Sequence, residues 1–131
     1  MFLVLDAQVE LYKGGIVPLS EYAERPKDRD ILVHIIVPKK NAQFNYQSVR
    51  ISQTDIPVLT CASVKDENGY RFGARPGRAM LFAPAGDTAE QMAEAVQNEV
   101  QTGSSLRGSA EYRRHLAGVL VRRAAQALDA E

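Results

Sequence analysis

The 131-residue sequence has a single cysteine, Cys61, and only two histidines, His34 and His115, which are far apart. One cysteine excludes an internal disulfide, and no cysteine–histidine cluster has the spacing of zinc ligands. Cys61 lies in an apolar run, which favours a buried structural role, since a nucleophilic cysteine needs polar surroundings that stabilise its thiolate. We therefore expect no metal site and a reducing, cytoplasmic environment.

Net charge is absent as well, because 16 basic side chains balance 16 acidic ones. Without a global field, the chain has little to attract nucleic acid or anionic lipid, and any electrostatic function must be local. The apolar stretch at the start lacks a basic flank and meets Asp6 early, so it predicts neither a signal peptide nor a membrane span. We expect no nucleic-acid partner and no membrane partner.

The familiar catalytic motifs are also missing. The sequence has no GxSxG, no P-loop, no HExxH and no GxGxxG, and its glycine-containing stretches at residues 14–18 and 72–77 do not follow the strand-to-helix pattern of a phosphate-binding loop. The residues alone predict an α+β domain that belongs to a larger protein and has no catalytic site of its own.

The first two thirds of the chain predict strands joined by short turns. An Asn-Gly pair within residues 65–70, flanked by strand-like runs, is typical of a hairpin. Short connections leave no room for crossovers, so we expect an antiparallel meander. The polar residues 39–43 predict a boundary between residues 1–39 and residues 40–131. The expected strands cover residues 2–11, 16–18, 31–37, 44–52, 56–64, 70–74 and 78–82.

The last third predicts two helices that pack on this sheet. Asp87 and Glu90 have the spacing of a capping box, and the apolar residues that follow repeat at helical spacing until Gly103. Ser109 is the expected N-cap of a second helix that extends to about Leu128. The predicted fold class is therefore α+β, an antiparallel meander packed against C-terminal helices.

Residues 106–125 contain five arginines and one histidine. On a helical wheel the arginines do not share a face, unlike those of a helix that tracks phosphates. We favour ion pairs between these arginines and the acidic side chains of the preceding helix. A protein interface is the alternative. Arg113 and Arg123 flank the apolar face and could lie along its edge. The expected apolar face contains Tyr112, Leu116, Val119, Leu120 and Ala127.

Several stretches of the sequence resemble the flavoprotein subunit of the molybdenum hydroxylases, the family of the xanthine dehydrogenase and carbon monoxide dehydrogenase medium subunits. SAEYRRHLAGVLVRRA, residues 109–124, resembles the C-terminal helix of that subunit. Residues 5–22 and 30–39 are similar to the end of its FAD-binding domain. YQSVRISQTDIPVLTCAS, residues 46–63, and GARPGRA, residues 73–79, are similar to the first strands and a loop of its C-terminal domain.

The resemblance implies a two-part organisation. Residues 1–39 would be the C-terminal remnant of the FAD-binding domain, and residues 40–131 a CO dehydrogenase flavoprotein C-terminal-like domain. The complete subunit would hold FAD, with the glycine-rich FAD-phosphate motifs in an N-terminal half upstream of Met1. Electrons would reach the flavin from the molybdopterin and iron–sulfur subunits of the complex. The resemblance thus implies part of an oxidoreductase that is not catalytic alone.

The resemblance also implies cofactor-binding residues near the flavin, namely Tyr46, Gln47 and Arg50. Some family members present a basic side chain to the flavin ring from this strand. In this sequence that position falls at or near Gln47, and Arg50 does not coincide with it. A cation would stabilise the negative charge of reduced flavin, whereas a glutamine can only form a hydrogen bond.

A different class of function stays open, a stand-alone interaction or dimerisation module that has lost flavin binding. If residues 2–11 formed a strand with a free edge, that edge would favour pairing with a second copy. We therefore also expect a possible homodimer.

Overall fold

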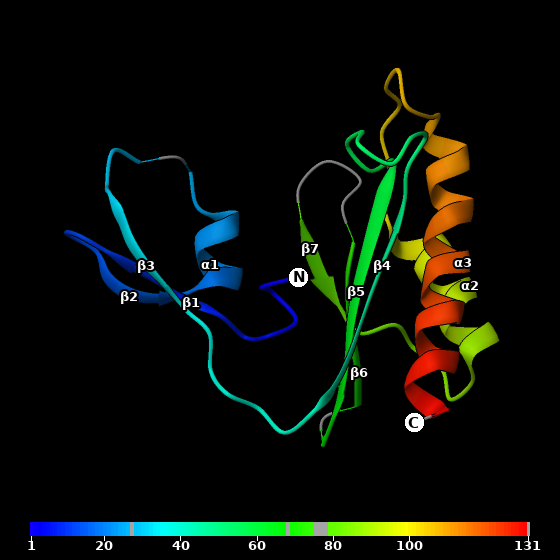
Figure 1. Cartoon of the computed structure of the whole chain (residues 1–131), viewed down its shortest axis with the longest axis horizontal. Helices are drawn as coiled ribbons and strands as arrows, with labels where there is room; N and C mark the ends of the chain where they lie inside the picture. The colour runs from blue at the N-terminus through cyan, green and yellow to red at the C-terminus, as the bar shows by residue number, and fades with distance from the viewer. Residues whose placement is uncertain (27, 68, 75–78, 131) are drawn as a thin grey trace.

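The computed structural model describes residues 1–26, 28–67, 69–74 and 79–130. Within them, two antiparallel sheets are followed by two long helices (Figure 1). The first sheet has the order β2-β1-β3 and the second the order β4-β5-β6-β7, which confirms the α+β class and, for the second sheet, the meander. The first sheet contains β1 (Gln8–Leu11), β2 (Gly15–Pro18) and β3 (Leu32–Ile36), with the short helix α1 (Leu19–Glu24) between β2 and β3. The second contains β4 (Gln43–Val49), β5 (Leu59–Asp66), β6 (Gly69–Ala74) and β7 (Met80–Phe82), and α2 (Ala89–Glu99) and α3 (Ala110–Asp129) follow it.

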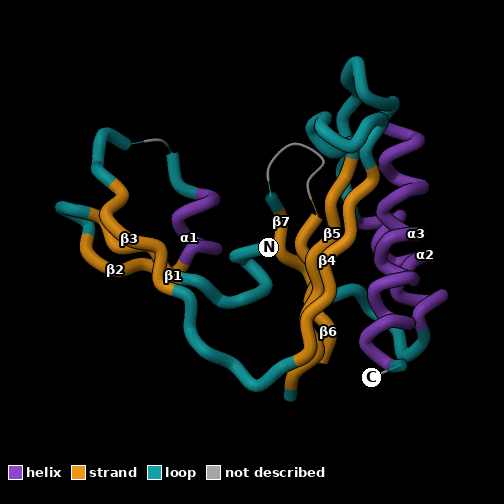
Figure 2. Tube along the Cα trace, viewed as in Figure 1, coloured by secondary structure: helices purple, strands orange, loops and turns teal. Residues whose placement is uncertain are grey.

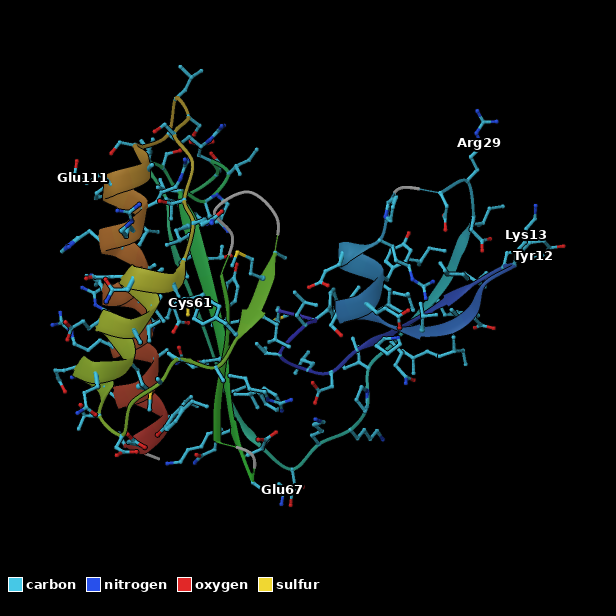
Figure 3. All side chains as sticks on the ribbon, turned by 180° about the vertical axis from the view of Figure 1, so that it is seen from behind. Tyr12, Lys13, Arg29, Cys61, Glu67 and Glu111 are labelled. Atoms are coloured by element: carbon cyan, nitrogen blue, oxygen red, sulfur yellow. The ribbon has the colours of Figure 1, made fainter. Side chains whose placement is uncertain are left out.

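The helices α2 and α3 cover one face of the second sheet (Figure 1). Cys61 on β5 points into this interface, where it packs with apolar side chains of both helices (Figure 3). Burial raises the pKa of the Cys61 thiol to about 12, so the thiol stays protonated and unreactive at neutral pH. The alternate residues Ala62 and Val64 face the opposite side of the sheet, where Val4 packs against them.

The expected hairpin around the Asn-Gly pair forms between β5 and β6, whose register runs to Asp66 opposite Gly69. Asn68 of this turn lies outside the described residues, as do residues 75–78 of the stretch 73–79 that supported the resemblance.

The strand predicted at residues 2–11 is wrong for its first half. Only Gln8–Leu11 is a strand, and the residues before it form turns, with the Val4 amide donating to the Met1 carbonyl at 3.1 Å and Asp6 at a φ of 50°. The physical reason is tertiary packing, because the turn places Val4 on the back of the second sheet. Since β1 is paired on both sides, it has no free edge, and the basis for the expected homodimer is lost.

The start of α2 also differs from the expectation by one residue. Thr88, not Asp87, is the N-cap, and its side chain accepts from the amide of Gln91, whose own side chain accepts from the Thr88 amide. The capping box therefore uses Gln91 rather than Glu90. The two side chains can serve equally, because both carry an oxygen that accepts a hydrogen bond. The prediction of Ser109 as N-cap of α3 is confirmed.

The buried face of α3 is wider than the expected one and rotated from it. Tyr112 is 46% exposed, whereas Arg113 is 8% exposed and Val121 only 1%. The helix packs on both the sheet and α2, and two neighbours bury a broader arc than one. The buried residues of α3 are Arg113, Leu116, Ala117, Gly118, Leu120, Val121, Ala124, Ala125 and Leu128.

The expected ionic pairing between α2 and α3 is also wrong. In the part of the chain that the structure describes, no ion pair joins the two helices. Their contact is made by apolar side chains such as Val96 and Val121, while Arg114, Arg122 and Arg123 are exposed. Exposed ion pairs contribute little to stability, so apolar packing decides how the helices meet.

A cluster of charged side chains joins the N-terminal turn to the second sheet. Arg71 on β6 donates to both carboxylate oxygens of Asp6, at 2.7 and 2.8 Å, and also pairs with Asp66. Lys40, in the segment between the sheets, pairs with Asp6 as well. Partial burial by itself raises the pKa of Asp6, but the hydrogen bonds from Lys40 and Arg71 outweigh it and hold this pKa below its ordinary value.

We expect Asp6→Asn to lower the free energy of unfolding at neutral pH and to have no effect at a pH below the pKa of Asp6. Because the folded pKa lies below the ordinary 3.8, ionised Asp6 stabilises the fold above about that pH. The stabilisation is lost as the pH falls through the lowered pKa. Chemical denaturation at several pH values measures the difference, with the exposed Glu67→Gln as control (Figure 3). An equal loss at neutral and acid pH would contradict the role of ionisation.

Candidate functional site

A cavity of about 600 Å³ lies at one end of the second sheet, beyond β4 and the start of β5. Two loops surround it, the β4–β5 connection and the α2–α3 connection, which approach each other at this end of the sheet (Figure 1). Its volume is within the usual range of small-molecule sites. The lining residues are Tyr46, Arg50, Ile56, Pro57, Val58, Leu59, Thr60, Gly103, Ser104, Ser105, Arg107 and Arg113.

An arginine–carboxylate pair holds the two loops together. Arg107 of the α2–α3 loop donates from Nε and an Nη to Asp55 of the β4–β5 loop, with distances of 2.9 to 3.3 Å. Arg50 donates to the carbonyl of Asp55 at 2.6 Å. The hydrogen bond from Arg107, with help from the Ile56 amide, keeps the pKa of Asp55 below its ordinary value. Asp55 is therefore ionised at neutral pH and ties both loops at one point.

Arg113 of α3 borders the cavity and binds the two loops that surround it. It is on the first turn of α3, and its guanidinium donates to the Val58 carbonyl at 3.1 Å, to the Gly103 carbonyl and to the Ser105 hydroxyl. These acceptors belong to both loops, and a guanidinium can reach them together because its N–H groups point in fixed, diverging directions. Arg113, which was expected only to flank the apolar face of the helix, is thus buried and binds both loops.

The structure brings two of the three predicted site residues together. Tyr46 and Arg50 both line the cavity, and Tyr46 is 50% exposed on the face of the sheet away from the helices. Gln47 lies opposite Cys61 in the β4–β5 register, which places it on the helix-covered face, and its amide donates to the Asn45 side chain at 3.0 Å. A single ligand on the open face would therefore meet Tyr46 and Arg50 but not the side chain of Gln47.

Sequence reasoning missed the contribution of Arg107 and the two serines of the α2–α3 loop. The Ser104 hydroxyl accepts from the Ala110 amide at 2.9 Å, and the Ser105 hydroxyl accepts from the Arg107 amide at 3.2 Å. The one signal available was the arginine count of residues 106–125. It could not show that Arg107 and Arg113 turn toward the sheet while the other arginines stay in solvent.

The described residues offer one side for a flavin ring but no glycine-rich loop for its phosphates. Tyr46 offers an exposed ring against which a planar heterocycle could pack. No glycine-rich loop before a helix, the usual phosphate cradle, borders the cavity within the described residues. Among those same residues, no group of three or more metal-ligating side chains could hold an ion, and no helix has the length and hydropathy to cross a bilayer.

Comparisons with known proteins give one family match and a curated relative. The family model of the CO dehydrogenase flavoprotein C-terminal domain matches residues 83–128. Uncharacterized protein YgfM of Escherichia coli K12 is 30% identical over 128 residues, covering 92% of this chain and 49% of YgfM.

Solved structures share the fold over nearly the whole chain. A carbon monoxide dehydrogenase chain from Hydrogenophaga pseudoflava has a TM-score of 0.79 and 22% identity, covering 98% of this chain and 54% of that one. A chain of quinoline 2-oxidoreductase from Pseudomonas putida 86 has a TM-score of 0.78 and 15% identity, covering 97% and 53%. This chain thus spans about half the length of these relatives. Residues 83–128 thus match the CO dehydrogenase flavoprotein C-terminal domain, and nearly the whole chain shares the fold of these solved chains.

Proposed function

We propose that this chain forms one wall of an FAD site and helps to relay electrons in a molybdenum-hydroxylase complex. The observation that carries the proposal is the open face of the second sheet, where Tyr46 is half exposed beside Arg50 and the cavity. Within the described residues no glycine-rich phosphate loop borders that face, so the N-terminal FAD-binding half would have to complete the site. Alone, the chain is not catalytic.

The domain organisation follows from the same reasoning. Residues 1–39 would be the end of the FAD-binding domain and residues 40–131 the C-terminal domain, joined by a loop that runs between the two sheets (Figure 2). The first sheet supports this division because β3, one of its edge strands, exposes Leu32, Val33 and Ile35 by 40 to 46%. An exposed apolar edge strand is a surface that native proteins normally pair or cover. We assign that cover to the N-terminal half.

In this arrangement the bound FAD would accept electrons and pass them on. Tyr46 would pack against its ring system and exclude water from one side, as aromatic side chains do with planar ligands. Arg50 would place a positive charge near the ring, which favours the reduced, more negative flavin. Gln47 would act only through the strand backbone, since its side chain lies on the other face.

The partners would be the molybdopterin and iron–sulfur subunits of the complex. Support comes from the solved neighbours, which are carbon monoxide dehydrogenase and quinoline 2-oxidoreductase chains. The buried, free thiol of Cys61 fits the cytoplasmic location that we propose for this complex.

Variants of the site residues in a subunit that includes the FAD-phosphate half test the proposal. We expect Tyr46→Ala to weaken FAD binding by up to roughly tenfold, the size of a lost aromatic contact. Tyr12→Ala is the matched control, since Tyr12 lies at the far tip of the first sheet (Figure 3). Flavin fluorescence measures affinity and stopped-flow absorbance measures flavin reduction.

The same assay tests Gln47 and Arg50. Arg50→Gln should slow flavin reduction more than it weakens FAD binding, because the lost charge stabilises the reduced form. If Gln47→Ala changes neither quantity, Gln47 makes no flavin contact. A Tyr46→Ala subunit that binds and reduces FAD as well as the Tyr12→Ala subunit would contradict the proposed wall.

A further inference from the structure

We infer that the cavity between the two loops binds a small oxyanion, the phosphate or carboxylate group of a ligand other than the flavin ring. The central observation is Arg113, whose side chain is almost wholly buried and lines the cavity. Its hydrogen-bond partners in the described part of the chain are two carbonyls and a hydroxyl, all neutral. Within the described residues, no carboxylate lies at ion-pair distance from this guanidinium. A buried charge without a counter-charge is costly, and an anion in the cavity would relieve that cost.

The charges around the cavity also favour an anionic ligand. Three arginines, Arg50, Arg107 and Arg113, line it, and no acidic side chain is among the described lining residues. Among the residues that the structure describes, the one carboxylate in contact with these arginines is that of Asp55, which is bound by Arg107. A formal excess of two positive charges therefore surrounds a cavity of about 600 Å³.

The neutral groups of the lining suit the same ligand class. The hydroxyls of Thr60, Ser104 and Ser105 can donate to an oxyanion, as serine and threonine do in many phosphate sites. Arg50 is exposed and uses one N–H group for the Asp55 carbonyl, which leaves its other donors available to a ligand. Guanidinium groups pair with phosphate and carboxylate in a bidentate manner.

A purely structural account of the arginines is the alternative. In that account Arg113 and Arg107 only tie the two loops together, and the cavity has no preference for anions. Variants of Arg50 and Asp55 distinguish a structural role of the arginines from anion binding. Removing a charge at either position should change anion affinity only if the cavity binds anions. The inference does not depend on flavin binding, and its test contains no flavin.

The test is a titration of the 131-residue chain with inorganic phosphate, followed by amide NMR at constant ionic strength maintained with sodium chloride. We expect saturable shifts confined to residues 50–60 and 103–113. A parallel titration with acetate separates the two sources of an oxyanion. Saturation by phosphate alone identifies a phosphoryl ligand, and saturation by acetate alone a carboxylate ligand.

Three variants distinguish binding in the cavity from general attraction to a charged surface. Arg50→Gln should weaken phosphate binding roughly tenfold, the usual size of a lost charge-assisted hydrogen bond. Asp55→Asn should strengthen it severalfold, because asparagine can still accept from Arg107 but removes the negative charge. Arg122→Gln, which changes an exposed arginine of α3 outside the cavity, should leave the affinity unchanged.

Shifts that do not saturate with either anion, or that spread over the whole surface, would overturn the inference. So would an Arg122→Gln variant that loses as much affinity as Arg50→Gln, because attraction would then follow net charge rather than the cavity.

Discussion

Replacing Arg113 by methionine is expected to destabilise the chain by about 2–4 kcal/mol. Methionine keeps much of the side-chain length but provides no donor, so the Val58 and Gly103 carbonyls lose their hydrogen bonds from Arg113. Leaving the carbonyl of the buried Val58 unsatisfied costs about 1–3 kcal/mol, and losing the hydrogen bond to the carbonyl of the exposed Gly103 adds about 1 kcal/mol. Removal of a buried charge offsets part of this loss, and we therefore expect no more than this sum.

Urea denaturation followed by circular dichroism measures the effect of Arg113→Met. The matched control is Arg122→Met on the same helix, where the arginine is exposed and the change should be within about 0.5 kcal/mol. Arg113→Lys should recover only part of the stability, because an ammonium cannot reach three diverging acceptors as a guanidinium does. If Arg113→Met and Arg122→Met have equal effects, Arg113 does not hold the two loops.

Truncation of Leu120 to alanine is the other change with a large expected effect, about 2–5 kcal/mol. Leu120 is 1% exposed and lies in the core cluster that joins α2, α3 and the helix-covered face of the second sheet. The deleted methyl groups would leave a cavity that neighbours on three elements cannot fill without moving.

The matched control for Leu120→Ala is Leu106→Ala. Leu106 is fully exposed at 103% in the α2–α3 loop, so its truncation removes no buried contact. Denaturation midpoints should fall clearly for the first variant and stay within error for the second. A Leu120→Ala chain as stable as the wild type would contradict the assignment of this cluster as the main core.

The strands and helices were predicted from local sequence patterns. The Asn-Gly pair between two strand-like runs indicated the β5–β6 hairpin, and Ser109 indicated the start of α3. These signals depend on backbone chemistry within a few residues, which a sequence displays directly. The N-terminal error arose because Val4 has its partners on β5, about sixty positions away in the chain, and periodicity contains no information about such contacts.

The candidate site was predicted only in part for a similar reason. Tyr46 and Arg50 follow from their place on a strand that resembles a known family. Arg107 and Arg113 line the same cavity only because the α2–α3 loop folds back onto the end of β4 and β5. On a helical wheel Arg113 was one of several scattered arginines, and its burial depends on acceptors that the fold supplies.

The most direct test of the central claim is a titration of FAD into the 131-residue chain, alone and together with a chain that carries the glycine-rich FAD-phosphate motifs, followed by flavin fluorescence. The account predicts no saturable binding by the 131-residue chain alone and tight, stoichiometric binding by the pair, with higher affinity than the motif-bearing chain has by itself. Tight binding by the 131-residue chain alone would contradict the claim that this chain provides only one wall of the site. A pair that binds FAD no better than the motif-bearing chain would contradict the claim that it provides a wall at all, and would favour an interaction module without flavin.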